Sequence, residues 1–310
     1  MKLFCEKLNG FINSLLTKMT IENKSKNTTK AYSHTYKMFI EFCEQSDKEL
    51  SFETLREDDI YSYISYRSSI MNKQGELSAS TINSIVSHLK RLFIHIERNS
   101  NELLDFSKVF DDIKIKPTKK IPKGLSDKEL SKLDIYIKDT INNPGITYQA
   151  LRNILLLKLM LLGGLRASET LTIKLSDFIA DGEFYKISFF GKGKKHRIVY
   201  VVRSDFKDEL ELFKIKFNIQ DSSLIALTSN DTVMDRFQLS DAMKYIYKLS
   251  NIKVSGVHIL RHTAAKRLLA NNVNITVVQS ILGHSSIQST TIYTNPTEEI
   301  MRAEMLKVKL

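Results

Sequence analysis

The sequence predicts a mainly α-helical protein of two domains, the second of which also contains a small antiparallel sheet. Over most of the chain, apolar residues recur at spacings of three and four, which is the pattern of amphipathic helices. Two neighbouring segments, 184–189 and 197–202, instead alternate with the period of two that is typical of strands. A lysine-rich stretch that contains two prolines indicates a linker. We therefore expect domains at 1–107 and 126–310, joined by a basic linker at 108–125.

The first domain is predicted to be entirely helical. Each expected helix carries one apolar stripe that can face a common core, and a serine, threonine or asparagine stands before two of them as a capping residue. In chain order we expect a helix over 3–19, a second capped by Asn27 or Thr28, a third over Glu57–Ser69, and a fourth capped by Ser78 or Ser80 that runs to Ile96.

The second domain is predicted to begin at a helix start. Ser126 and Glu129 have the spacing of a capping box. A long apolar helix follows from Tyr148 to Leu162 and ends at a glycine pair, which is typical of a helix C-terminus. After the hairpin of 184–202, further helices are expected near 205–216, 238–249, 258–271, 275–282 and 297–308.

Composition narrows the class of partner. Lysine and arginine exceed aspartate and glutamate by 46 − 35 = 11, a balance that favours a polyanion such as nucleic acid. The bland alternative is a generically basic protein. With only Cys5 and Cys43, neither a disulfide framework nor a zinc site is indicated, and a reducing cytosol fits. We expect no signal peptide, and the apolar run Ile154–Leu162 is too short for a membrane span.

A set of scattered side chains indicates phosphoryl transfer without a metal. A pentavalent phosphorane carries extra negative charge on its non-bridging oxygens, and the arginine fork suits that geometry. Arg166 and Arg261 are candidates for this role, and the phenol of Tyr293 can act as a nucleophile that becomes a covalent phosphoester. The segment 191–195 lacks the spacing of a phosphate-binding P-loop. His258 and His262 lie four residues apart, but neither an intervening glutamate nor a nearby third ligand supports a metal site.

Each of these residues also has an ordinary interpretation. Arg166 after the glycine pair can be a surface arginine, Lys192 a solubilising turn residue, and Tyr293 a core tyrosine. Order and spacing change this weighting. The motifs are Gly164-Leu165-Arg166-Ala167-Ser168-Glu169, Gly191-Lys192-Gly193, His258-Ile259-Leu260-Arg261-His262-Thr263, Leu282-Gly283-His284-Ser285 and Tyr293-Thr294. Together they resemble the tyrosine recombinases, and the Xer-type subgroup looks most similar.

The resemblance covers nearly the whole chain, because Thr29-Lys30-Ala31-Tyr32 is similar to the start of that family's core-binding domain. It implies a SAM-like core-binding domain that clamps DNA, followed by an α+β catalytic domain. It also implies roles for individual residues: Arg166 and Arg261 as the phosphate clamp, His258 and His284 as the active-site histidines, Lys192 as general acid, Tyr293 as nucleophile and Glu169 as a supporting carboxylate. Lys194 is an alternative to Lys192, because hairpin turns can slide.

The implied activity is site-specific recombination through a 3′-phosphotyrosyl intermediate and a Holliday junction, with no metal or other cofactor. Within it we expect Xer-type chromosome dimer resolution at cell division, with integration of a mobile element as the alternative. A type IB topoisomerase-like enzyme is less favoured, and a non-catalytic DNA-binding module would need no placed phenol. Basic residues expected to contact DNA are Lys30, Lys90, Arg91, Lys119, Lys120 and Lys194.

The expected partner is a double-stranded recombination site, on which paired sites hold a homotetramer. The resemblance implies that the segment from Thr297 to Leu310 docks into a neighbouring protomer, and packing on its own domain is the alternative. A related recombinase or a DNA translocase is a possible further partner, and no membrane partner is expected. The expected location is cytoplasmic, with the nucleoid.

Overall fold

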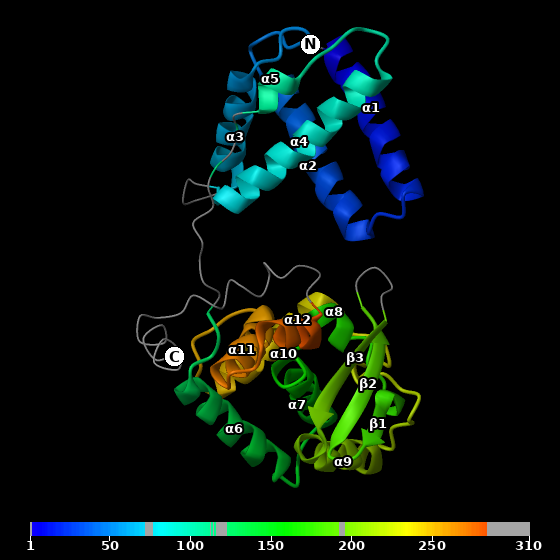
Figure 1. Ribbon diagram of the computed structural model, residues 1–310, viewed down its shortest axis with the longest axis vertical. Helices are drawn as coiled ribbons and strands as arrows, with labels where there is room; N and C mark the ends of the chain where they lie inside the picture. The colour runs from blue at the N-terminus through cyan, green and yellow to red at the C-terminus, as the bar shows by residue number, and fades with distance from the viewer. Residues whose placement is uncertain are drawn as a thin grey trace, which may run out of the picture. The chain divides into compact units, whose positions relative to one another are not determined.

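The computed structural model describes residues 2–71, 77–111, 113, 115, 123–191 and 196–283. The chain divides into two compact units, Met1–Lys119 and Lys120–Leu310. Both units are mainly helical, and the second also holds a small antiparallel sheet (Figure 1). The predicted fold class is therefore confirmed.

The first unit packs its helices around one apolar core. Its largest fully buried side chains are aromatic, and Phe39 lies edge-on to both Tyr63 and Phe93. Val109 and Phe110 are buried in the same core, so this unit extends along the chain beyond residue 107. Its helices are α1 (Lys2–Ile21), α2 (Lys26–Gln45), α3 (Glu57–Met71), α4 (Ala79–Asn99) and α5 (Ser107–Phe110).

Side-chain caps set the starts of α2 and α4. Ser78 accepts a hydrogen bond from the backbone N–H of Thr81. Of the two caps predicted for α4, Ser78 and Ser80, the N-cap is therefore Ser78. The predicted caps of α2 were wrong. Ser25 fills that position by accepting from the N–H of Thr28, which leaves Asn27 and Thr28 inside the first turn.

The second unit is built around α7, which is buried along nearly its whole length and packs against α6, α9, α10 and α11 (Figure 1). The predicted capping box of Ser126 and Glu129 is present at the start of α6. The helices are α6 (Asp127–Ile141), α7 (Tyr148–Leu161), α8 (Ala167–Thr170), α9 (Lys207–Phe217), α10 (Arg236–Leu249), α11 (His258–Ala270) and α12 (Ile275–Leu282).

The sheet has the strand order β1-β2-β3 and is antiparallel throughout. Its strands are β1 (Phe178–Asp181), β2 (Phe184–Phe190) and β3 (His196–Val202). Ile187 pairs with Val199, and both are buried on the inner face. Sequence reasoning missed β1, because this four-residue edge strand has three exposed residues in a row and so lacks an alternating apolar pattern.

The predicted helix over 297–308 lies outside the described residues. Within the described part of the chain, no helix has both the length and the apolar character that are needed to cross a membrane.

Candidate active site

Arg166 stands where α7 has ended and α8 begins. Gly164 takes a φ of +63°, which favours glycine, and turns the chain so that Arg166 becomes the N-cap of α8. Glu169, in the first turn of α8, receives two hydrogen bonds from Arg166, one from its backbone N–H at 2.8 Å and one from Nη1 at 2.8 Å. This local pairing orients the guanidinium of Arg166. The Arg166 side chain is 29% exposed.

The second predicted arginine comes from α11. Arg261 is buried and donates from Nη1 to the carbonyl of Gly164 at 2.6 Å, which ties α11 to the turn before Arg166. His258 is the first residue of α11 and is exposed. Because residues three apart share a helix face, His258 lies on the side of α11 from which Arg261 extends.

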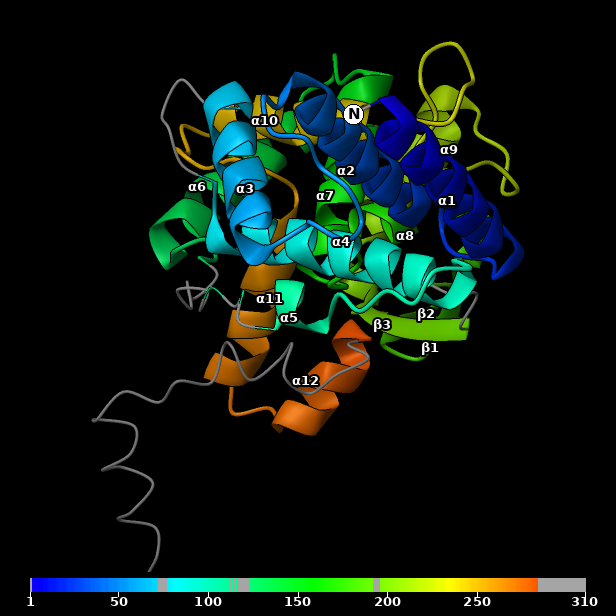
Figure 2. The same ribbon diagram turned by 90° about the horizontal axis from the view of Figure 1, so that it is seen from above.

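The C-terminal end of α12 brings these arginines together. A helix leaves its last carbonyls without intrahelical partners, and these carry partial negative charge. The carbonyls of residues 281, 282 and 283 accept, in that order, from Arg197 at 2.8 Å, Arg261 at 2.6 Å and Arg166 at 2.7 Å. Three cationic side chains from β3, α11 and the start of α8 therefore converge on one helix end. Figures 1 and 2 show α12 beside α11, against which it packs.

Glu169 is the buried anion of this cluster. It is 3% exposed and forms ion pairs with Arg166 at 2.8 Å and with Arg197 at 2.7 Å. Burial alone would raise the pKa of Glu169, but the backbone N–H of Arg166 and the charge of Arg197 outweigh it, so the pKa is lowered below its usual value. Glu169 is thus held as a carboxylate between two guanidinium groups.

Sequence reasoning missed Arg197. The strand pattern could have indicated it, because Arg197 stands in the inward-facing positions of β3 together with Val199 and Val201. An arginine in that phase of a strand needs a buried partner, and Glu169 provides it.

A second histidine lies close to His258. His262 is half-buried, and its pKa is lowered by burial and, to a lesser degree, by the neighbouring His258 and Arg261. The neutral imidazole is therefore favoured at this position.

Other predicted site residues fall outside the described chain: Lys192, Lys194, His284, Tyr293, Lys119 and Lys120. Gly283, whose carbonyl accepts from Arg166, directly precedes His284.

Three of the predicted DNA contacts lie in the first unit. Lys30 is exposed on α2. On α4, Lys90 pairs with Asp111 at 3.3 Å and Arg91 pairs with Glu22 at 3.3 Å. Exposed pairs of this kind contribute only about 0–1 kcal/mol. Lys90 and Arg91 also line a cavity of about 500 Å³ between α1 and α4, together with Lys18 and Arg98.

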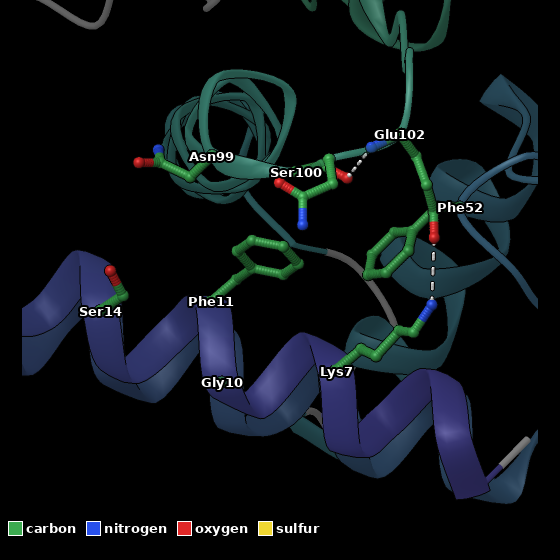
Figure 3. A pocket seen from close by; sticks show the side chains of 9 residues that line it. Lys7, Gly10, Phe11, Ser14, Phe52, Asn99, Ser100 and Glu102 are labelled. Carbon is green, nitrogen blue, oxygen red and sulfur yellow. Dashed lines mark hydrogen bonds and ion pairs between the residues drawn. The ribbon is translucent and has the colours of Figure 1, made fainter.

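A different cavity in the first unit, of about 520 Å³, contains none of the predicted site residues (Figure 3). Phe11 and Phe52 form its apolar walls, and an exposed ion pair between Lys7 and Glu102 crosses one end at 3.2 Å. The predicted catalytic residues that the structure describes all lie in the second unit.

Comparison with known proteins decides the family. The sequence model described as "Phage integrase family" matches residues 128–299, which is more than half of the chain. The chain belongs to the phage integrase family. A second model, described as "Phage integrase, N-terminal SAM-like domain", matches residues 11–102 of this family member. The predicted tyrosine recombinase relationship is therefore confirmed, and the chain belongs to a class of DNA strand-transferring enzymes.

Relatives of this phage integrase family member carry Xer names. Tyrosine recombinase XerH of Campylobacter jejuni is 29% identical over 178 residues, which cover 57% of this chain and 49% of that protein, or about half its length. Tyrosine recombinase XerC of Staphylococcus aureus is 27% identical over 302 residues, which cover 94% of this chain and 93% of the relative. A crystal structure of XerH bound to a palindromic difH substrate, a post-cleavage complex, shares the fold with a TM-score of 0.76 at 22% identity and covers 95% of this chain and 83% of that one.

Proposed function

We propose that this chain is a site-specific recombinase that cuts and rejoins DNA strands through a 3′-phosphotyrosyl intermediate. The observation that carries the proposal is the convergence of Arg166 and Arg261 on the adjacent carbonyls of residues 283 and 282. Two guanidinium groups held at one helix end suit the charge of a scissile phosphate and of its pentavalent transition state.

The chemistry follows from the residue types. A free tyrosine has a pKa of about 10, so the Tyr293 hydroxyl needs a proton acceptor or a stabilised transition state before it attacks. Arg166 and Arg261 supply that stabilisation. His258, exposed at the start of α11, accepts a proton or donates to a phosphate oxygen. His284 donates to a non-bridging oxygen.

The leaving group completes the balance of the reaction. Lys192, or Lys194 if the turn slides by two residues, protonates the departing 5′ oxygen. The bond from phosphorus to that oxygen breaks as the bond to the tyrosine oxygen forms. Because one phosphoester replaces another, the energy of the linkage is conserved, and the reverse step rejoins a strand without ATP.

The biological role that we favour is chromosome dimer resolution in the cytoplasm, on the chromosome. The similarity to proteins named XerC and XerH supports this role. We infer that four copies assemble on two paired double-stranded sites, with the segment 297–310 of each copy docked into its neighbour. Integration of a mobile element is the second candidate and uses the same chemistry.

The decisive experiment traps the intermediate. A nicked duplex loses the short piece beyond the cut, so a cleaved complex cannot be resealed and accumulates. Tyr293→Phe is expected to bind the recombination site with unchanged affinity and to form no covalent protein–DNA adduct, because the variant lacks the nucleophilic oxygen. Denaturing gels separate the adduct, and mobility shifts report the binding. An adduct of wild-type yield from Tyr293→Phe would assign the nucleophile elsewhere.

A further inference from the structure

We propose that Arg197 is a positioning residue for strand cleavage, which connects the start of β3 to both halves of the phosphate clamp. The inference rests on the proposed recombinase function and adds a residue to that same site. Arg197 does not touch the DNA in this scheme. It acts through Glu169 and through the end of α12.

The contacts of Arg197 point in two directions. Its Nη1 donates to Oε2 of Glu169 at 2.7 Å, and its Nη2 donates to the carbonyl of Ile281 at 2.8 Å. Its guanidinium carbon lies 5.3 Å from the ring centre of Phe189, the residue that pairs with it across β2 and β3. The side chain is 11% exposed, so these N–H groups donate to protein acceptors rather than to water.

These two bonds join segments that lie far apart in the sequence. Arg197 is the second residue of β3, and the candidate general acid stands a few residues earlier in the sequence, at Lys192 or Lys194. Glu169 orients Arg166, one half of the phosphate clamp. The last turn of α12 holds Arg261, the other half. One guanidinium therefore sets the base of the hairpin, Arg166 and Arg261 relative to one another.

Close packing against Gly283 also constrains the position of the Arg197 side chain. Its φ is +62°, and a Cβ built on it would lie 2.6 Å from the guanidinium carbon of Arg197. The backbone at the end of α12 thus lies directly against Arg197. Removing the arginine leaves a gap there, into which the chain before His284 can shift.

The chemistry of the side chain explains why it is an arginine. A rigid fork can hold a carboxylate with one nitrogen and a carbonyl with another, whereas the single ammonium of lysine is a point charge on a flexible stem. Without Arg197, Glu169 keeps Arg166 as its one cationic partner among the described residues, and the two can turn together. A misplacement of about 1 Å in such a site costs on the order of 10²-fold in rate.

The test measures the single-turnover rate constant of covalent adduct formation on the nicked duplex, with protein in saturating excess. We compare Arg197→Met, Arg197→Lys and the control Arg203→Met, an identical change at an exposed arginine just beyond the other end of β3. Arg197→Met is expected to slow cleavage about 10²-fold while the dissociation constant for the site stays within about twofold. Arg197→Lys is expected to be intermediate and Arg203→Met to match the wild type.

A double-mutant cycle separates positioning from general stability. Because Arg197 acts in part through Glu169, Arg197→Met combined with Glu169→Gln is expected to slow cleavage by clearly less than the product of the two single effects. Rate constants are taken from the time course, and the active fraction is taken from its end point, so partial misfolding lowers the yield without changing the rate constant. Equal rate constants for Arg197→Met and the wild type would overturn the inference, as would purely multiplicative effects in the cycle. If the wild-type protein forms no adduct, the proposed function fails instead.

Discussion

At the scale of single residues, the site depends on one carboxylate that is buried between two cations. Taking Glu169 out of water is costly, and its charge is retained only because Arg166 and Arg197 both donate to it. Truncating one member of such a set leaves the others without a partner. The effects of mutating Glu169, Arg166 and Arg197 are therefore expected to be non-additive.

The lowered pKa of Glu169 makes a prediction about acid stability. A carboxyl whose folded-state pKa lies below the unfolded value of about 4.5 stabilises the fold above that pH, and the contribution is lost as the pH falls through the folded value. Glu169→Gln is expected to lose about 2 kcal/mol at neutral pH. Its melting temperature should then fall less steeply than that of the wild type below about pH 4.5. Thermal unfolding between pH 7 and 3 measures both. A constant difference over this range would mean that Glu169 is not the titrating group.

The sequence was sufficient to find residues that stand in local motifs and insufficient for those that act through the fold. Arg166 and Glu169 lie three residues apart, as do His258 and Arg261, so each pair can be read from its own segment. Arg166 and Arg261 are brought together by main-chain carbonyls at the end of α12. Every residue has such a carbonyl, so the sequence does not indicate which ones bind the arginines. Arg197 was missed because its role depends on Glu169, 28 residues earlier in the chain.

At the scale of helices and strands, capping residues and the spacing of apolar residues determine which elements could be predicted. The longer helices of both units follow from apolar spacing, whereas the four-residue helices α5 and α8 were not predicted, and the capping box at Ser126 and Glu129 was placed correctly. The end of α12 was also predicted near Leu282, where Gly283 provides the left-handed C-cap. The edge strand β1 could not be predicted, because its exposed residues carry no alternation.

Gly283 provides a test at this scale. Gly283→Ala combines an unfavourable positive φ with a clash against Arg197, whereas Gly182→Ala, at a φ of +59° with nothing within 4 Å of its Cβ, has only the backbone penalty. We expect Gly182→Ala to destabilise the protein by about 1 kcal/mol and Gly283→Ala by about 2–3 kcal/mol. Only Gly283→Ala should also slow cleavage. Chemical denaturation and the adduct assay give the two values, and equal losses would show that the chain relaxes around the new methyl group.

At the scale of the whole molecule, the chain consists of two units that each have a hydrophobic core. Predicted phosphate-binding lysine and arginine residues lie in the first unit, and the described clamp lies in the second. The net charge of +11 favours a polyanionic partner. The chemistry that we propose at the scissile linkage, by contrast, uses residues of the second unit alone.

The last residues of the chain are predicted to act between molecules. The segment 298–310 contains Ile300, Met301, Met305, Leu306 and Val308 and is too short to be helical by itself, so it needs a docking surface. Deleting 298–310 is expected to abolish the pairing of two sites while leaving single-site binding within about twofold. Mobility shifts with one and with two labelled duplexes distinguish these outcomes. Undiminished pairing would place the segment on its own domain.

The three carbonyls at the end of α12 also set the order in which the enzyme can become active. Arg166 finds its carbonyl acceptor 117 residues further on, and Arg197 finds its own 84 residues further on. Contacts of such separation cannot form until residue 283 has been synthesised and has left the ribosome. Translation therefore adds 117 residues after Arg166 and 84 after Arg197 before their acceptors exist, and Tyr293, the proposed nucleophile, is made later than both acceptors.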